Sequence, residues 1–278
     1  PFQRNISASG GIASAIYMWL KNIGGISTGA FIDSDWSVKI CIFRPGDSFD
    51  RLSNSKYSYS DPSEIYEEVR PYIKEGKIVV FIGLPCQIAG YKKTFGNKDN
   101  LYYVDLVCHG VAPNSYLRQH ISKIEQKVGV RAAEMSFRAP EMGTANYYFT
   151  LYDNDGKISY AKRSIDGDNY NIAFHRGYSY RENCYHCHYA RPERCSDLTI
   201  GDYHGLGKLQ PCDFDNDNVS VILANTDKGN ELLKRLIDAE LVAVYERPVE
   251  EPIQGDSQLR HPTLKSKFRY DFEKYIVR

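Results

Sequence analysis

Residues 77–128 alternate two short apolar runs with two helical stretches, and no other part of the chain constrains the fold as strongly. The runs Lys77–Ile82 and Leu101–Val107 are rich in β-branched and aromatic residues, which predicts buried strands. Helical stretches follow each of them, at about 87–95 and 113–128. A strand–helix–strand–helix order of this length implies parallel strands joined by right-handed crossovers.

A cysteine follows each of these two predicted strands. Cys86 comes directly after the first strand, in the break Gly83-Leu84-Pro85-Cys86, and Cys108 comes directly after the second. Parallel neighbours bring their carboxyl ends to the same edge of a sheet, where open α/β sheets bind ligands. We therefore expect the two thiols to emerge side by side at that edge.

The rest of the chain adds further elements to this unit. Helices are expected at about 12–23, 63–74, 170–176 and 228–240, with a weak one in the tail 258–276, and strands at 27–33, 36–43, within 133–160, and at 197–201, 219–224 and 241–245. The predicted fold class is α/β (α+β): a mixed β-sheet with a parallel strand–helix–strand unit, flanking helices and a cysteine-rich loop.

The cysteine-rich loop spans 181–205 and holds three of the seven cysteines. Its C-x-x-C pair, Cys184 and Cys187, has a spacing that lets two thiolates bind one metal centre. Three interpretations compete: a structural zinc site completed by His186, His188 or Cys195, a redox dithiol, and an iron–sulfur cluster completed by Cys86 and Cys108. The topology supplies four thiols without any histidine, so the cluster is the leading hypothesis and zinc the alternative.

Composition restricts the partners. The 35 basic and 35 acidic residues balance, so nothing indicates a nucleic acid or another polyanion as a partner. The longest apolar runs, such as Ile78–Leu84, are too short to span a bilayer, and no secretory signal is visible. An odd number of unevenly spaced cysteines fits reduced thiols, so we expect a cytoplasmic protein.

Two more positions are candidate functional sites because of the residues next to them in the sequence. The small residues before the first helix, with Ser9 as its expected N-cap, leave backbone N–H groups free to approach an anion, although a plain capped surface helix explains them as well. His109 directly follows a predicted metal ligand at a strand end. It is the best candidate proton donor among the histidines, and a surface role is the alternative.

Five separated motifs occur in one order: SASGG at 7–11, NSKYSYS at 54–60, FIGLPCQIAGY at 81–91, DLVCHGVAP at 105–113 and CYHCHYARPERCSDLTIGDYHG at 184–205. Together they closely resemble the beta-subunit family of coenzyme F420-reducing hydrogenase and formate dehydrogenase. The resemblance covers about residues 7–207 and is loose beyond them.

The resemblance implies a single catalytic domain over 1–278 that binds FAD with its part at about 1–130 and a 4Fe-4S cluster with its part at about 131–278. The implied cluster ligands are Cys86, Cys108, Cys184 and Cys187, with Cys195 in reserve. The implied flavin contacts are Ser7, Ser9, Gly10, Gly11, Ser55, Lys56, Tyr57, Ser60, Gly83, Pro85 and Asp202. Lys56 is also a catalytic candidate, because a cation near the flavin ring stabilises the reduced form.

The resemblance further implies electron or hydride transfer to a small organic or deazaflavin acceptor. Many relatives carry an N-terminal ferredoxin-like segment, and no such cysteine cluster precedes Ser7 here, so we expect either a separate ferredoxin-like donor or acceptor or direct reduction of the flavin. The family's Trp-Gly after the aspartate is replaced by His204-Gly205. A zinc-stabilised or flavin-less accessory protein of polysaccharide biosynthesis and an electron-transfer subunit without its own substrate remain alternatives, and homo-oligomerisation stays open.

Overall fold

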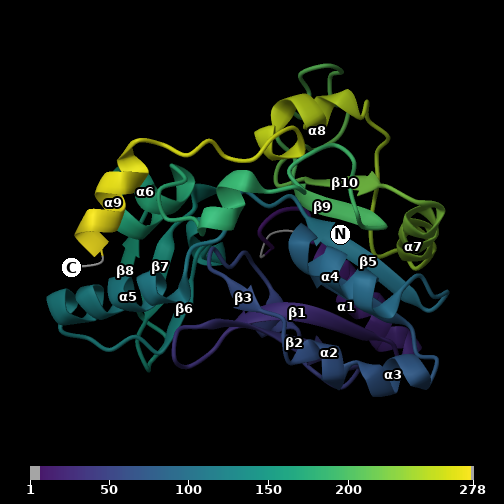
Figure 1. Ribbon diagram of the computed structural model, residues 1–278, viewed down its shortest axis with the longest axis horizontal. Helices are drawn as coiled ribbons and strands as arrows, with labels where there is room; N and C mark the ends of the chain where they lie inside the picture. The colour runs from purple at the N-terminus through teal and green to yellow at the C-terminus, as the bar shows by residue number, and fades with distance from the viewer. Residues whose placement is uncertain (1–6, 277–278) are drawn as a thin grey trace.

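The computed structural model describes residues 7–276 of the chain and contains two β-sheets with helices packed around them (Figure 1). The larger sheet has seven strands in the order β10-β9-β5-β4-β1-β2-β3, and the smaller one has the order β6-β7-β8. The strands are β1 (Ile26–Ile32), β2 (Val38–Phe43), β3 (Ser60–Asp61), β4 (Val79–Gly83), β5 (Leu101–Leu106), β6 (Glu134–Ser136), β7 (Phe149–Tyr152), β8 (Ile158–Lys162), β9 (Leu198–Asp202) and β10 (Ser220–Ala224).

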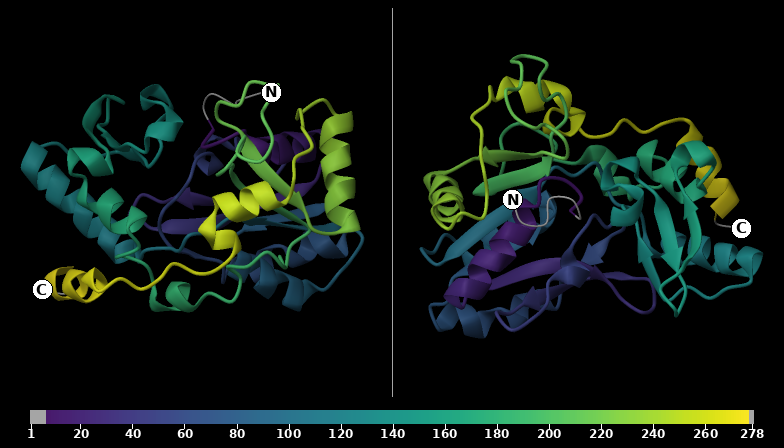
Figure 2. Two further views of the ribbon diagram at one scale, coloured as in Figure 1. Left: turned by 90° about the horizontal axis from the view of Figure 1, so that it is seen from above. Right: turned by 180° about the vertical axis from the view of Figure 1, so that it is seen from behind.

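The helices lie on both faces of the larger sheet and beside the smaller one (Figures 1 and 2). They are α1 (Ile12–Ile23), α2 (Ile65–Glu68), α3 (Arg70–Lys74), α4 (Pro85–Phe95), α5 (Asn114–Val128), α6 (Asn169–His175), α7 (Asp227–Asp238), α8 (Glu250–Gly255) and α9 (Phe268–Ile276). None of the helices in the described range is long and apolar enough to cross a membrane.

The predicted parallel unit is confirmed. Strand β4 pairs in parallel with β5, from Val79 opposite Leu101 to Gly83 opposite Asp105. Strand β9 continues the parallel order on the other side of β5, and β1 pairs in parallel with β4. The mixed character comes from the antiparallel strands β2 and β10, which lie next to β1 and β9.

Strand β4 is buried on both faces, as a central parallel strand requires. Val80 and Ile82 contact the core beneath α1 and α7, whereas Val79 and Phe81 contact the core beneath α2, α3 and α4. This alternation follows the two-residue period of a strand. Two hydrophobic layers therefore hold the sheet rigid and fix the position of its carboxyl edge.

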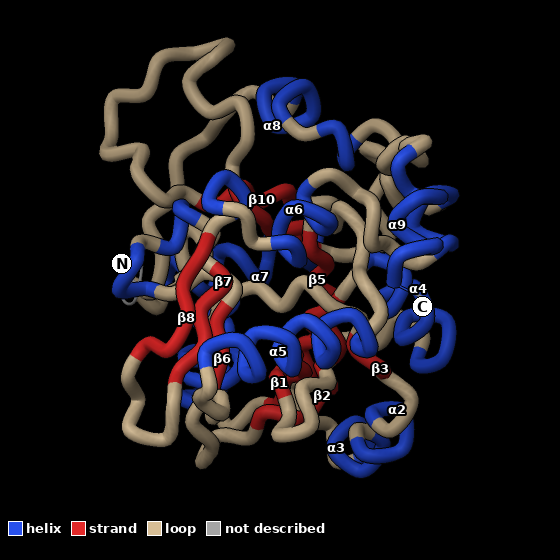
Figure 3. The backbone as a smooth tube through the Cα atoms, turned by 90° about the vertical axis from the view of Figure 1, so that its left-hand side faces the viewer, coloured by secondary structure: helices blue, strands red, loops and turns tan. Residues whose placement is uncertain are grey.

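The smaller sheet packs against α5 and α6 through a separate aromatic core that includes Phe137, Phe149 and Tyr170. Figure 3 shows α5 running alongside this sheet. The hairpin between β7 and β8 turns at Asn154-Asp155-Gly156, where Gly156 has φ of 73°. This layer supplies one wall of the cavity described below.

Two local predictions are wrong. Residues 241–245 form no strand: Glu240 takes a left-handed conformation with φ of 57°, and the Leu241 N–H closes the end of α7 on the carbonyl of Leu236. Leu241 and Val242 then pack on the core without pairing. At the other end of the chain the N-cap of α1 is Gly11 and not Ser9.

Candidate functional site

A cavity of about 510 Å³ opens at the carboxyl edge of β4, β5 and β9, within the size range of small-molecule sites. Its walls come from the segment before α1, the loop before β3, the turn between β4 and α4, and the ends of β5 and β9. Of the residues expected to contact a cofactor, Ser7, Ser9, Gly11, Ser55, Lys56, Tyr57, Ser60, Gly83 and Asp202 line this cavity. Gly10 and Pro85 do not line it.

The segment before α1 is hydrogen-bonded to β10, an edge strand of the larger sheet. The hydroxyls of Ser9 and Ser220 are 2.7 Å apart, and the Gly10 N–H donates to the same Ser220 oxygen at 2.8 Å. Helix α1 begins with Gly11 at φ of 87° and has no side-chain cap. Its first N–H groups therefore remain available to a ligand in the cavity.

Lys56 lies in the cavity wall and is held by its own loop. Its Nζ donates to the carbonyls of Ser53 and Asn54, at 2.5 and 3.1 Å. Burial lowers the pKa of Lys56 from 10.5 to about 7. The amine therefore gains or loses its proton near neutral pH. A charged ligand in the cavity would shift that protonation equilibrium.

Asn54 is a site residue that the sequence reasoning missed. It adopts a left-handed backbone with φ of 65°, and its buried Oδ1 has no hydrogen-bond partner among the described residues. The residue lines the cavity. Buried amide oxygens are nearly always paired, so this one is open to a donor from water or from a ligand in the cavity. No sequence pattern distinguishes it from an ordinary loop asparagine.

The remaining loop residues are positioned by packing. The Tyr57 ring stacks on Phe174 with centroids 4.5 Å apart. Ser60 accepts two hydrogen bonds from the Gln87 Nε2, at its carbonyl (2.8 Å) and its hydroxyl (3.0 Å). Gly83 leaves room for that side chain, since a Cβ there would lie 3.0 Å from the Gln87 Oε1. The loop and the β4–α4 turn are thus tied together.

The thiols of Cys86, Cys108, Cys184 and Cys187 lie close enough to act on one another electrostatically. Burial raises the pKa of Cys108, and the other three thiols raise it further. Burial also raises the pKa of Cys86 to about 11, with added effects of Cys187 and Cys184. Mutually repelling thiolates of this kind are stabilised when a cationic metal centre lies among them.

The backbone around the thiols is specialised. The Gly110 N–H is directed at the Cys108 sulfur and partly offsets the rise of its pKa. Gly110 has φ of 136°, and a Cβ there would lie 2.4 Å from the Tyr180 ring. Only glycine fits this position, which lets the chain turn from β5 past the thiols.

Cys195 has contacts that differ from those of the four thiols. Its sulfur lies 3.5 Å from the Pro85 carbonyl, and the charges that act on its pKa are those of Asp105, Arg194 and Lys92. Among the described residues, no three thiols lie within 4.8 Å of one another. A single zinc ion with bonds of about 2.3 Å holds its sulfurs about 3.8 Å apart, so the four thiols are spaced more widely than one ion requires.

Arg194 fixes the loop that carries Cys184 and Cys187. Its guanidinium donates to the Asp105 carboxylate at 2.9 Å and to the Tyr189 carbonyl at 2.8 Å. Both charged side chains are almost fully buried, 2% and 0% exposed. The cysteine-rich loop is therefore anchored to β5, the strand that ends just before Cys108.

Asp202 is held in the cavity wall by two hydrogen-bond donors. Its Oδ2 accepts hydrogen bonds from the Arg138 Nη1 at 2.6 Å and from the Tyr147 hydroxyl at 3.1 Å. The Arg138 guanidinium also lies over the Tyr147 ring, 4.5 Å from its centroid. Arg138, Tyr147 and His175 all line the cavity. They come from the connection between β6 and β7 and from α6, and no motif in the sequence identifies them.

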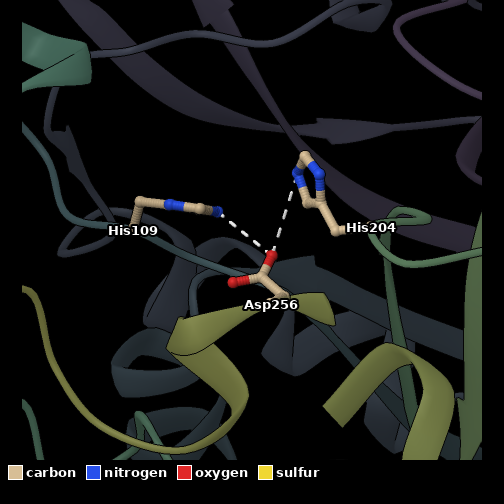
Figure 4. Close-up of side chains that lie close together, drawn as sticks. All are labelled: His109, His204 and Asp256. Atoms are coloured by element: carbon tan, nitrogen blue, oxygen red, sulfur yellow. Dashed lines mark hydrogen bonds and ion pairs between the residues drawn. The ribbon is translucent and has the colours of Figure 1, made fainter. Parts of the chain in front are cut away.

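His109 lies at the cavity, paired with a residue from the far end of the chain. Its Nε2 is 3.2 Å from the Asp256 Oδ2, and the His204 Nε2 is 3.9 Å from the same oxygen (Figure 4). Burial alone would raise the pKa of Asp256, but the hydrogen bond and charge of His109 hold it below its ordinary value. The sequence does not identify Asp256, and it marks His204 only as a departure from the family's Trp-Gly.

Comparisons with known proteins identify the family and the fold. The profile of the coenzyme F420 hydrogenase/dehydrogenase family, for the C-terminal part of its beta subunit, matches residues 76–249, more than half of the chain. Ten chains of solved structures match, among them one from the xenon-derivatized F420-reducing NiFe hydrogenase complex of Methanosarcina barkeri. That pair has 19% identity and a TM-score of 0.55, over 88% of this chain and 78% of that chain, which establishes the fold alone. No curated protein matches.

Proposed function

Since the chain belongs to the coenzyme F420 hydrogenase/dehydrogenase beta-subunit family, we propose that it is an iron–sulfur flavoprotein that passes electrons to or from a small organic or deazaflavin acceptor. Family membership indicates an oxidoreductase or electron-transfer role. The observation that carries the finer proposal is the placement of four mutually interacting thiols at the sheet edge where the cavity opens.

Cys86, Cys108, Cys184 and Cys187 would hold a 4Fe-4S cluster. A cluster carries its thiolates on separate irons, which suits thiols spaced more widely than one zinc ion allows. Backbone N–H groups directed at the sulfurs, such as that of Gly110, would tune its potential. Cys195 stays outside this ligand set, because the charges that act on its pKa are those of Asp105, Arg194 and Lys92.

The cavity would hold FAD. The uncapped start of α1 suits the pyrophosphate, and the unpartnered Asn54 amide oxygen suits a donor on the flavin or its ribityl chain. Lys56, with its lowered pKa, would become protonated beside an anionic reduced flavin and stabilise it. When bound, a flavin exchanges one or two electrons and a cluster one, which is the chemistry this pair supplies.

Arg138, Tyr147 and Asp202 would position the ligand in the cavity, since all three line it and hold one another. His109 would donate a proton to the acceptor, oriented by Asp256. The similar solved structure is that of a hydrogenase complex, so a protein electron partner such as a ferredoxin is part of the proposal. A cytoplasmic location fits reduced thiols.

Anaerobic purification followed by an absorption spectrum and by iron, sulfide, zinc and flavin analysis tests the proposal. We expect about four irons and four sulfides per chain, as the cluster's formula states, together with noncovalent FAD. Stoichiometric zinc without iron or flavin would contradict the proposal and support the polysaccharide accessory alternative. If the cofactors are bound but deazaflavin and nicotinamide donors are not turned over, the result would support the alternative of an electron-transfer subunit without its own substrate.

A further inference from the structure

The side chains of His109, His204 and Asp256 form a second ligand cluster, separate from the thiols. Within residues 7–276 it is the one group of three or more His, Cys, Asp or Glu side chains whose ligand atoms all lie within 4.8 Å of one another. Figure 4 shows both imidazoles directed at the same carboxylate. From this geometry we propose that the three residues bind a divalent first-row transition metal ion of the zinc class.

The spacing of the three ligand atoms suits such an ion. The Asp256 Oδ2 lies 3.2 Å from the His109 Nε2 and 3.9 Å from the His204 Nε2. Bonds of about 2.0–2.1 Å in tetrahedral geometry place ligand atoms about 3.3 Å apart. The three ligand atoms all lie within 4.8 Å of one another, so side-chain rotations alone would bring them around one ion.

The cluster is held by contacts that an accidental cluster of surface groups does not have. The second Asp256 oxygen, Oδ1, accepts the Gln258 N–H at 2.8 Å, which fixes the carboxylate plane. The Thr263 hydroxyl donates to the His109 carbonyl at 3.1 Å and accepts from the Gln258 Nε2 at 2.8 Å. The bond to Oδ1 is of the kind that orients a ligating carboxylate, and the Thr263 bonds hold the backbone that carries His109.

A close approach of two glycines brings His204 to Asp256. A Cβ on Gly255 would lie 2.0 Å from the His204 carbonyl oxygen, and a Cβ on Gly205 would lie 2.9 Å from the Gly255 Cα. Gly205 also has φ of 86°. The residues directly before Asp256 and directly after His204 are thus both glycines, and only glycines allow this backbone contact.

The types of ligand indicate the class of ion, and their exposure indicates an open coordination position. Two imidazoles and one carboxylate, without thiolate, suit Zn²⁺ and similar divalent ions rather than Ca²⁺ or Mg²⁺. Asp256 is 5% exposed, whereas His109 and His204 are 44% and 45% exposed. Because all three residues line the cavity, the open coordination position would face it and bind an oxygen atom of a small substrate. With the ion bound, His109 is a ligand and no longer the proton donor.

Cobalt(II) titration of the reduced protein tests this site, because cobalt bound by thiolate absorbs in the near ultraviolet and cobalt bound by imidazole and carboxylate does not. We expect visible ligand-field bands without thiolate charge transfer, persisting in the Cys86→Ser/Cys184→Ser double variant and displaced by zinc. His204→Gln and the isosteric Asp256→Asn should each weaken binding at least about a hundredfold, since even outer partners cost 10–100-fold.

The matched control is His261→Gln, which changes an exposed histidine five positions after Asp256 and outside the cluster. It should bind cobalt like the wild type. Cobalt bound through thiolates alone, or affinity unchanged in both His204→Gln and Asp256→Asn while they stay folded by circular dichroism, would overturn the site. Iron, sulfide and flavin analysis of the wild type decides the proposed function separately, so either proposal can fail alone.

Discussion

The Arg194 guanidinium and the Asp105 carboxylate form a buried ion pair, 2.9 Å apart, between the cysteine-rich loop and β5. The pair joins two segments that each carry proposed cluster ligands. Burial raises the pKa of Asp105, and Arg194 opposes that rise. The aspartate therefore depends on this one cation to remain charged inside the protein.

Arg194→Met should lower the free energy of unfolding by about 3–5 kcal/mol, because it leaves Asp105 buried without a compensating charge. Urea denaturation at neutral pH measures the change. Arg191→Met, at an exposed arginine of the same loop, is the control and should change stability by less than about 0.5 kcal/mol. The double variant Asp105→Asn/Arg194→Met should recover part of the loss. Equal stability of the two single arginine variants would show that the pair has no structural role.

Cys108→Ser should reduce bound iron and sulfide to a small fraction of the wild-type content, because serine cannot replace a buried thiolate ligand. Cys195→Ser is the matched control and should retain the full content, since the charges that act on the Cys195 pKa are those of Asp105, Arg194 and Lys92. Iron and sulfide analysis after anaerobic purification makes the comparison. If Cys195→Ser loses the cluster and Cys108→Ser keeps it, the ligand set is wrong.

Lys56 should make stability rise with pH. Its pKa is about 7 in the folded chain and 10.5 ordinarily, so between these values the unfolded chain binds a proton that the folded chain has released. Relative to Lys56→Met, the wild type should gain up to about 1.4 kcal/mol of unfolding free energy per pH unit above pH 7, and nothing below about pH 6.

Urea denaturation at several pH values, without added flavin, measures this difference. Lys74→Met, at an exposed lysine, should show no such slope relative to the wild type between about pH 7 and 9. A constant difference between the wild type and Lys56→Met over that range would mean that Lys56 keeps its ordinary pKa.

Gly110→Ala should destabilise the protein more than Gly129→Ala does. Both glycines have positive φ, 136° and 73°, which costs alanine about 1–2 kcal/mol. At Gly110 the new Cβ also meets the Tyr180 ring at 2.4 Å, whereas nothing lies within 4 Å at Gly129. This overpacking should lower the free energy of unfolding of Gly110→Ala by a further ~1–3 kcal/mol, the cost usual for such clashes. The iron content of the variant should fall as well. Thermal unfolding of the two variants side by side is sufficient, and equal melting temperatures would refute the clash.

Asn54→Gly should weaken flavin binding by up to about tenfold, the equivalent of one hydrogen bond, with little change in stability. Glycine keeps the left-handed backbone and removes only the amide. Fluorescence titration with FAD measures the affinity. Glu240→Gly is a matched control, because Glu240 also has positive φ, at 57°, but does not line the cavity. An unchanged affinity for Asn54→Gly would exclude Asn54 as a flavin contact.

Much of the fold could be predicted from local patterns. The apolar runs before Cys86 and Cys108 are short and separated by a helix, which predicts parallel neighbours, so the shared edge follows from topology. The pairing of Val79–Gly83 with Leu101–Asp105 confirms it. The failure at 241–245 has an equally local cause, since two apolar residues beyond a helix are as well suited to packing as to a strand.

For the site, the sequence predicts the cysteines, whereas other residues are identified only by the tertiary structure. Cysteine spacing and order along the chain carry enough information to place the thiols at one edge, because a strand end fixes where the next residue lies. Arg138 with Asp202, and His204 with Asp256, are 64 and 52 residues apart along the chain, as their numbers give by subtraction. Such pairs depend on how the smaller sheet and the C-terminal segment pack against the larger sheet. Only the tertiary structure decides that packing, because it results from many side-chain contacts that no local pattern records.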